Sequence, residues 1–491
     1  MPIFRKEIKK EFRNFMKLKS IYETSMAGAK ISPVAKGQRI PVGTKNLCCA
    51  IVVNKSDVAQ KIKGFGCALT ESAQFVLSKL SSKNRERAID LCFGQNPLEA
   101  NCYLFARTHM NSCDFSVENW NCVPQKDESL QSFSFAEAEK RIVPLLESAL
   151  KRNEQIQFML SPWSPPAWMK TNNDMNHGGK LKGEYRKTWA EYFVRYIKEL
   201  AARGVNVKYV SIQNEPEAAQ TWDSCNWEPE EEAEFAMKYL RPEFEKAGLG
   251  EMKILVHDHN RDSLYERFSR AMKFPGAADA IDGAAYHWYS GDQYENLRKC
   301  ALEFPQKELV FSEGSIEGGS HPGKWYCGER YAHNIINDLN SGCTIWIDWN
   351  MILDLQGGPN HAGNFCDAVI LADTEKDALC VQNSYNYIGH FSRFIKPGAE
   401  RLAFKMLSYH EPSTVDGLVG NMVEFTSFKN SDGTIALVVL NRLDVDAPFS
   451  VEFIEGEYKE IEQDYSKPVS TMESGEAFFC PARSIQTYIF E

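Results

Sequence analysis

The chain has 491 residues, 43% of them hydrophobic and 25% charged, which is typical of a globular protein long enough for two or more domains. Its net charge of −10 argues against a nucleic-acid partner, because neutralising phosphates requires a basic surface. No segment approaches the ~18 uninterrupted apolar residues of a membrane-spanning helix, and the 14 cysteines lack C-x-x-C spacing, which favours buried, reduced thiols.

The first 30 residues carry basic side chains throughout and no continuous apolar stretch. They are therefore unlike a secretion signal, and we expect a cytoplasmic protein. Phe4, Ile8, Phe12 and Met16 recur every four residues, which predicts an amphipathic helix over residues 1–30 that packs on the body of the protein. A helix lying on a membrane surface is the alternative.

Strand-like runs follow over residues 31–60, of which CCAIVVN (48–54) is the clearest. We expect these strands to join a second group of strands at the other end of the chain. That arrangement makes the β domain discontinuous in sequence.

Residues 61–395 alternate between short apolar runs and helical patterns. Eight runs read as strands: 64–69, 102–108, 155–161, 207–213, 253–257, 281–288, 308–312 and 343–349. Residues 188–204 and 228–248 are the clearest helices, and the second has an acidic first turn and a terminal glycine, as helix ends favour. Eight strands alternating with helices predict an α/β fold, a closed (β/α)8 TIM barrel. An open dinucleotide-binding sheet is the weaker alternative, since Gly64 and Gly66 lack the third glycine of its fingerprint.

In residues 396–491 alternating strand patterns replace the strand–helix alternation, which predicts an antiparallel β-sandwich. Residues 422–443 are two alternating strands joined by Asn-Ser-Asp-Gly, a hairpin signal. FSVEFI (449–454) and SIQTYIF (484–490) continue the pattern.

Active sites of such barrels gather at the C-terminal ends of the strands, and here those ends carry polar and aromatic residues. Glu215 and Glu313 end the fourth and seventh strands, which face one another across the ring. Glycoside hydrolysis needs such a pair, one carboxyl to protonate the leaving oxygen and one carboxylate on the opposite face of the sugar. The sequence therefore predicts a glycosidase, and the acid of the pair is expected to have a raised pKa.

Three other functions have less support in the sequence. A metal-dependent hydrolase is suggested by His257, Asp258, His259 and Asp262, of which the two histidines can share one side of a strand; no second ligand motif supports it, and we expect neither a metal nor another cofactor. A serine esterase is disfavoured because no G-x-S-x-G occurs. A carbohydrate-binding protein without activity would not need both carboxylates.

From Gly64 to about Asp373 the sequence resembles family 30 of the glycoside hydrolases, the family that includes lysosomal acid β-glucosidase. The resemblance rests on SCDFS (112–116), SPWSPPAWMKTN (161–172), QNEP (213–216), HWY (287–289), SEG (312–314) and WNMILDLQGGPNHAGNFCD (349–367). It implies a retaining β-glycosidase that releases a terminal β-glucosyl unit, with a β-1,6-glucanase, β-xylosidase or β-fucosidase as alternatives. The partner is then a β-linked glycoside or short oligosaccharide.

The resemblance also implies a role for each matching residue. Glu215 is similar to the general acid/base and Glu313 to the nucleophile. Further side chains match contacts of the sugar: Asp114, Trp163, Asn214, Tyr289, Trp349 and Asn364. Arg107 and His287 match residues that orient the carboxylates. The segment after the fourth strand departs from the lysosomal enzyme, and there Trp222 and Trp227 either stack on a second sugar or pack in the core.

Overall fold

The computed structural model describes residues 16–28, 30–34, 39–40, 49–408, 423–456 and 476–491. The chain divides into two compact units. Residues 64–388 form one unit, and residues 1–63 together with 389–491 form the other.

The first unit confirms the predicted (β/α)8 barrel. Eight strands close in the order β10-β11-β12-β5-β6-β7-β8-β9, and every neighbouring pair is parallel. The strands are β5 (Gly64–Ala68), β6 (Phe105–Met110), β7 (Gln157–Pro162), β8 (Val207–Ser211), β9 (Lys253–Asn260), β10 (Gly283–His287), β11 (Glu308–Glu313) and β12 (Ile345–Asn350). Each predicted run overlaps one of them.

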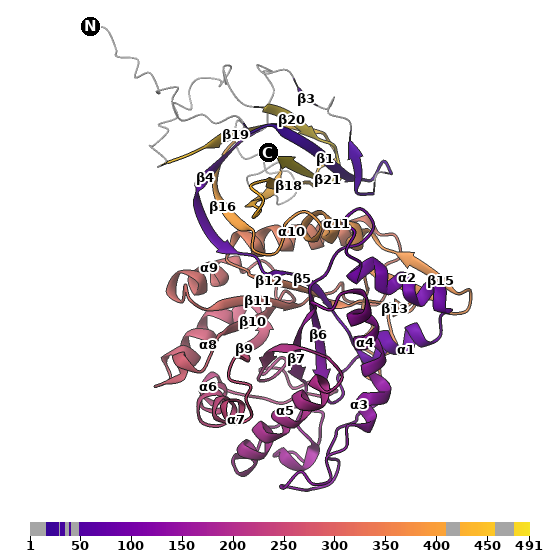
Figure 1. The fold of residues 1–491 in the computed structure, drawn as a ribbon, viewed down its shortest axis with the longest axis vertical. Helices are drawn as coiled ribbons and strands as arrows, with labels where there is room; N and C mark the ends of the chain where they lie inside the picture. The colour runs from indigo at the N-terminus through magenta and orange to yellow at the C-terminus, as the bar shows by residue number, and fades with distance from the viewer. Residues whose placement is uncertain (1–15, 29, 35–38, 41–48, 409–422, 457–475) are drawn as a thin grey trace. The chain divides into compact units, whose positions relative to one another are not determined.

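Helices lie outside the ring of strands (Figure 1). They are α1 (Glu71–Ser78), α2 (Ser82–Phe93), α3 (Ala136–Arg141), α4 (Val143–Arg152), α5 (Arg186–Ala201), α6 (Pro229–Phe235), α7 (Arg241–Lys246), α8 (Arg261–Lys273), α9 (Tyr294–Glu303), α10 (Trp325–Asn340) and α11 (Asn383–Ser392). Short 3-10 turns occur at Ala167–Met169, Gly183–Tyr185 and Ala277–Asp279. A small sheet of β13 (Leu353–Asp354), β14 (Ile370–Asp373) and β15 (Ala378–Val381) completes the unit.

The helix predicted over 228–248 is interrupted. Between α6 and α7 the chain makes a π-helical turn, η5 (Ala236–Leu240). Pro242 in the first turn of α7 has no N–H to donate to an earlier carbonyl, so the regular hydrogen-bond ladder cannot pass through it. The helix ends before Gly248, whose φ is +77°, a left-handed conformation that glycine adopts readily.

Apolar side chains fill the inside of the barrel. One buried cluster draws members from seven of the eight strands: Phe105, Met159, Tyr209, Leu255, Ala285, Val310, Ile345 and Ile347. These residues precede the C-terminal ends of their strands. They therefore form a packed apolar layer directly below the polar residues at the strand ends.

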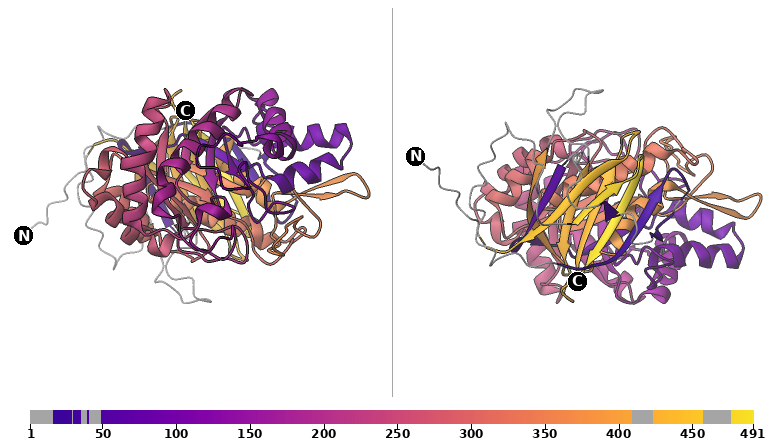
Figure 2. Two further views of the ribbon diagram at one scale, coloured as in Figure 1. Left: turned by 90° about the horizontal axis from the view of Figure 1, so that it is seen from below. Right: turned by 90° about the horizontal axis from the view of Figure 1, so that it is seen from above.

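The second unit is built on a ten-stranded sheet, in the order β2-β1-β21-β18-β17-β16-β4-β19-β20-β3. Its strands are β1 (Leu18–Ser25), β2 (Ser32–Val34), β3 (Arg39–Ile40), β4 (Cys49–Lys61), β16 (Glu400–Ser408), β17 (Glu424–Lys429), β18 (Ile435–Asn441), β19 (Ala447–Ile454), β20 (Glu476–Cys480) and β21 (Ser484–Phe490). The predicted hairpin is confirmed by the antiparallel pairing of β17 with β18. β4 pairs antiparallel with β16 and parallel with β19, so strands from both ends of the chain lie side by side (Figure 2).

The helix predicted for residues 1–30 is wrong where the structure describes that segment. Leu18–Ser25 is strand β1, paired antiparallel with β21 and β2. Leu18 and Ile21 are buried in the apolar core of the sheet, so this part of the segment is held by sheet pairing and core packing. Of the four residues with helical spacing, Met16 precedes β1 and packs against this core, and Phe4, Ile8 and Phe12 lie outside the described residues.

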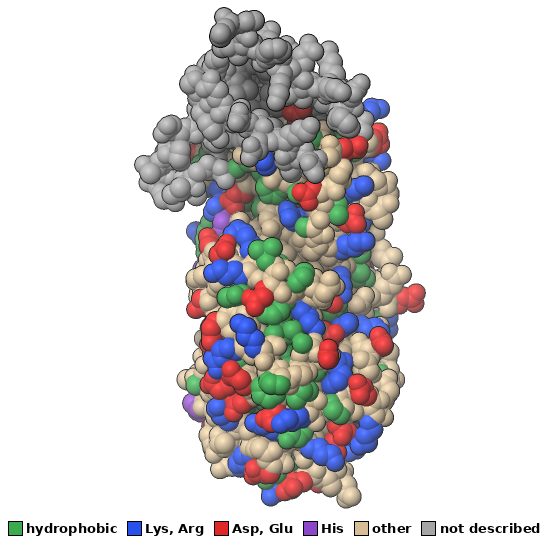
Figure 3. Space-filling model, turned by 90° about the vertical axis from the view of Figure 1, so that its left-hand side faces the viewer, with side chains coloured by type: hydrophobic (Ala, Val, Ile, Leu, Met, Phe, Trp, Pro, Cys, Tyr) green, Lys and Arg blue, Asp and Glu red, His purple; other side chains and the backbone are tan. Residues whose placement is uncertain are grey.

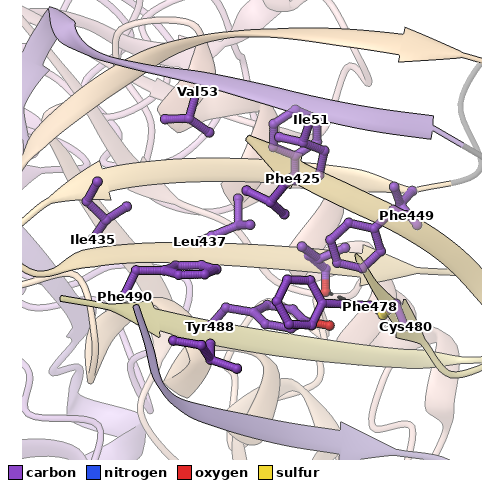
Figure 4. Packing of buried hydrophobic residues seen from close by; sticks show 14 of the residues in the cluster. Ile51, Val53, Phe425, Ile435, Leu437, Phe449, Phe478, Cys480, Tyr488 and Phe490 are labelled. Atoms are coloured by element: carbon purple, nitrogen blue, oxygen red, sulfur yellow. Dashed lines mark hydrogen bonds between the residues drawn. The ribbon is translucent and has the colours of Figure 1, made fainter. Parts of the chain in front are cut away.

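The core of this unit is rich in aromatic rings (Figure 4). Phe478 and Tyr488 have ring centroids 4.9 Å apart, and Phe449 packs edge-on against Tyr488 at 5.7 Å. These rings come from β19, β20 and β21 and are fully buried. Burial of each such side chain is worth roughly 1.5–3 kcal/mol.

The face of the molecule in Figure 3 carries acidic and basic side chains interspersed. None of the helices in the described part of the chain is both long and apolar enough to cross a membrane. Most of the cysteines that the structure describes are buried, as the sequence predicts.

Candidate active site

A cavity of about 250 Å³ opens at the C-terminal ends of the barrel strands. It is lined by Asp114, Trp163, Asn214, Glu215, Gln220, Trp222, His259, Asn260, Tyr289, Glu313, Glu317, Trp349, Asn364 and Cys366. Both predicted catalytic glutamates and all six predicted sugar contacts are in this set. Arg107 and His287 are fully buried and bond to residues that line the cavity.

Glu215 follows β8 on a turn with unusual backbone geometry. Its φ is +48°, a left-handed conformation that is rare for a residue with a side chain and that clusters at functional sites. The Glu215 N–H donates to the carbonyl of Asp258 at 2.9 Å, and the Asn214 N–H donates to the carbonyl of Pro162 at 2.8 Å. The backbone at Glu215 is thus held by both strands that neighbour β8, namely β7 and β9.

Glu313 is the last residue of β11 and is held at both carboxylate oxygens. Tyr289 Oη donates to Oε1 at 3.0 Å, and Arg107 Nη1 donates to Oε2 at 2.5 Å. Burial raises the pKa of the Glu313 carboxyl, while the charges of His287 and Arg107 oppose that shift.

Asp258, which the sequence suggests only as a metal ligand, lies among the side chains that support Glu215 and Glu313. It is fully buried and accepts from Arg107 Nη2 at 2.9 Å, from Ser211 Oγ at 2.6 Å and from Ser312 Oγ at 2.6 Å. Burial alone would raise the pKa of Asp258, but Arg107 and His287 hold it below the ordinary range. Its place at the end of β9 was the signal that could have revealed it.

His287 bridges the buried carboxylate of Asp258 and the half-buried carboxylate of Glu215. Its Nε2 lies 3.2 Å from Asp258 Oδ1 and its Nδ1 lies 3.3 Å from Glu215 Oε1. Burial lowers the pKa of the imidazole, but Glu313, Asp258 and Glu215 together raise it to about 9. His287 therefore carries a proton at neutral pH.

The raised pKa that the sequence suggested for Glu215 is wrong for the free protein. Burial raises it, yet hydrogen bonds and charges from His259 and His287 outweigh burial and lower the pKa below the ordinary range. The opposite pKa shifts of the two groups favour the His287 imidazole over Glu215 as the proton carrier of this pair.

Asp114 and Asn364 place polar atoms in the lining of the same cavity. Asn364 Nδ2 donates to Asp114 Oδ2 at 3.1 Å, while Asp114 Oδ1 is buried and has no hydrogen-bond partner among the described residues. Burial, and next the charge of Glu313, raises the pKa of Asp114 to about 8. Trp163 and Trp349 stack beside it with ring centroids 5.5 Å apart.

The two tryptophans of the divergent segment have different surroundings. Trp227 is buried and packs against Phe235, so it belongs to the core. Trp222 is half-buried, lines the cavity and packs against the cluster that contains Trp163. Trp222 is thus the one of the two that a ligand can reach.

Comparison with known proteins covers both units. A model of the glycosyl hydrolase family 30 TIM-barrel domain matches residues 62–395, and a model of the family 30 beta sandwich domain matches residues 398–488. The chain belongs to glycosyl hydrolase family 30. As a family 30 protein it is a glycosidase, and its substrate is a glycoside.

Similar family 30 proteins differ in what they act on. Lysosomal acid glucosylceramidase of Mus musculus is 32% identical over 411 residues, covering 80% of this chain and 77% of that protein. Endo-1,6-beta-D-glucanase of Neurospora crassa is 24% identical over 413 residues, covering 81% and 82%. The crystal structure of SrfJ from Salmonella typhimurium is 34% identical with a TM-score of 0.84, covering 96% of this chain and 98% of that one.

Proposed function

We propose that this family 30 glycosidase is a retaining, exo-acting β-glycosidase that hydrolyses β-glucosides. The observation that carries the proposal is the difference between the surroundings of Glu215 and Glu313. Both oxygens of Glu313 are held by donors, whereas Glu215 lies beside His287 and His259. A fixed carboxylate suits a nucleophile, and a carboxyl group beside imidazoles suits a general acid/base.

In the first step, a carboxylate oxygen of Glu313 bonds to the anomeric carbon as the bond to the leaving oxygen breaks. The leaving oxygen takes up the proton shared by Glu215 and His287, so the leaving group departs as a neutral alcohol. Asp258 faces the far nitrogen of His287 and keeps the imidazole oriented during this transfer.

In the second step, Glu215 removes a proton from water, and the hydroxide attacks the anomeric carbon. The bond to Glu313 breaks and its carboxylate is restored. Two inversions return the sugar with its original configuration.

Asn214 is oriented to bind the sugar. Arg107 Nη2 donates to Asn214 Oδ1 at 2.7 Å, which turns the amide nitrogen towards the remaining space as a donor. A donor at this place fits the 2-hydroxyl next to the anomeric carbon, where hydrogen bonds strengthen in the transition state. Asp114 Oδ1, which is buried and has no hydrogen-bond partner in the described part of the chain, fits a hydroxyl at the other end of the same ring.

A terminal β-glucoside is supported by similarity to glucosylceramidase. It is also supported by Asp114 Oδ1, which accepts no hydrogen bond from the described residues and would recognise a free distal hydroxyl. The alternative is cleavage within a β-1,6-glucan. It is supported by a solved endo-beta1,6-glucanase structure, 26% identical with a TM-score of 0.78 over 96% of this chain.

The test combines covalent labelling with product analysis. A glucose-configured cyclitol epoxide should label Glu313, located by peptide mass spectrometry, and Glu313→Gln should remain unlabelled and inactive. Glu215→Ala should retain slow release of activated aryl leaving groups. NMR should show the β-anomer of glucose as the first product. An α-anomer as first product, or fastest turnover of an aryl α-glycoside, would overturn the assignment.

Aryl β-glycosides of several sugars, β-linked disaccharides, glucosylceramide and a β-1,6-glucan then define the substrate. Release of glucose alone from the glucan chain end supports exo action. Early appearance of longer fragments would favour the endo alternative.

A further inference from the structure

Glu215, His259 and His287 each place one donor atom in a compact cluster. Glu215 Oε1 lies 3.3 Å from His287 Nδ1 and 3.8 Å from His259 Nδ1. All three donor atoms lie within 4.8 Å of one another. Ligand atoms around a tetrahedral Zn²⁺ with bonds of ~2.0–2.2 Å are separated by about 3.4 Å, so small side-chain rotations would bring all three into bonding distance.

Each imidazole also has a carboxylate behind it. His287 Nε2 lies 3.2 Å from Asp258 Oδ1, and His259 Nε2 lies 3.9 Å from Glu217 Oε2. Metal-binding histidines usually direct their second nitrogen to a carboxylate, which fixes the ring and makes the ligating nitrogen more basic. The His287–Asp258 pair has this geometry and is a second feature of a metal site. The distance from His259 to Glu217 is too long for a hydrogen bond, so Glu217 would have to move closer to support His259 in the same way.

The cluster is open on one side. Glu215 and His259 line the cavity, and the His259 side chain is 15% exposed. A metal ion bound there would reach solvent and keep a coordination position for water, as in zinc sites with three protein ligands.

This cluster differs from the one that the sequence suggested. His257 is buried, and its Nε2 lies 3.0 Å from the carbonyl oxygen of Asn260. His257 has a φ of +75° and Asp258 one of +43°, so the alternation that would place His257 beside His259 is broken. His259 instead meets residues from β10 and from the turn after β8.

We propose that Glu215, His259 and His287 form a binding site for a divalent transition metal ion such as Zn²⁺, and that the bound ion inhibits the glycosidase. The two imidazoles and one carboxylate are ligands that Zn²⁺ prefers. A bound ion occupies the Glu215 oxygen that must protonate the leaving group. The inhibition rests on the proposed function, whereas the binding does not.

Binding is tested with Zn²⁺ alone on protein treated with a chelator and then dialysed. Isothermal titration calorimetry should show one Zn²⁺ per chain, and Co²⁺ should give the visible absorption of a four-coordinate site. His259→Gln should weaken Zn²⁺ affinity at least tenfold. The matched control is His177→Gln, which alters an exposed histidine 3.0 Å from Asp174 and should bind as the unaltered protein does.

A second variant tests the same site in case His259→Gln fails to fold. Glu217→Gln removes the carboxylate behind His259 and should weaken Zn²⁺ binding several-fold, with circular dichroism confirming the fold of every variant. Equal affinity in the unaltered protein and in His259→Gln would overturn the proposal.

Inhibition is measured on an aryl β-glucoside with and without Zn²⁺. Half-inhibition should occur at the calorimetric Kd, should be reversed by EDTA, and should shift by the same factor in His259→Gln. If no glycoside is hydrolysed, the proposed glycosidase function fails. The calorimetric data still show whether Zn²⁺ binds at Glu215, His259 and His287. If Zn²⁺ binds but activity persists at saturation, the inhibitory part is overturned.

Discussion

Arg107 and Asp258 form an ion pair from which solvent is completely excluded, with 2.9 Å between Nη2 and Oδ2. Arg107 also donates to Glu313 and Asn214, and Asp258 also faces His287, which in turn reaches Glu215. One buried pair on β6 and β9 thus connects the nucleophile candidate to the acid/base candidate.

Arg107→Lys is expected to lower kcat at least 100-fold, about 2.7 kcal/mol in transition-state free energy. A lysine retains the charge but lacks the planar fork that reaches Glu313, Asn214 and Asp258 at once. Steady-state kinetics on an aryl β-glucoside give the measurement. The control is Arg261→Lys, since Arg261 forms a buried pair with Asp338 at 2.7 Å and does not line the cavity. Equal losses of kcat in the two variants would mean that the Arg107 effect is a general loss of stability.

Trp222→Ala is expected to raise the KM for a β-linked disaccharide three- to tenfold, the equivalent of about 0.5–1.5 kcal/mol of ring contact. Trp227→Ala should instead lower the free energy of unfolding by about 3–5 kcal/mol, because it empties a packed site in the core. Kinetics and chemical denaturation on both variants separate the two roles. A larger loss of stability in Trp222→Ala than in Trp227→Ala would reverse the assignment.

Asp114→Asn is expected to stabilise the protein more at pH 8 than at pH 4. The folded pKa of about 8 lies above the ordinary value of 3.8, so the unfolded chain loses its proton first and native stability falls as pH rises between those values. Asparagine does not ionise and escapes this loss. Denaturation at the two pH values measures the difference, and a gain that is independent of pH would contradict the raised pKa.

The buried His390 side chain is expected to make the stability of the β-rich unit sensitive to acid. Its Nδ1 lies 2.8 Å from Thr487 Oγ1 and its Nε2 lies 2.9 Å from Thr24 Oγ1, and burial lowers the pKa to about 3. The unfolded chain binds a proton near pH 6.5 while the folded chain does not, so stability should fall as pH drops from 6.5 towards 3. His390→Gln should make that decline shallower, as followed by thermal unfolding. An unchanged slope would show that other groups cause it.

The sequence alone determined the barrel and the positions of its polar strand ends. Apolar runs alternating with helical patterns have few packing solutions, so Glu215 and Glu313 could be placed on one rim before any contact was known. The segment over Leu18–Ser25 shows what local sequence patterns cannot predict. Its partner strand β21 lies more than 450 residues away in the chain, and local spacing carries no information about that pairing.

Only the tertiary structure decided the chemistry around the two glutamates. Whether a carboxyl gains or loses a proton depends on which charges burial brings within a few ångströms, and those charges come from strands distant in sequence. His259 and His287 lie on β9 and β10, yet they reverse the pKa expected for Glu215. Asp258 became part of the site because left-handed backbone geometry at His257 and Asp258 turned it beneath the rim. The sequence supplied the groups, and folding set their distances and therefore their charges.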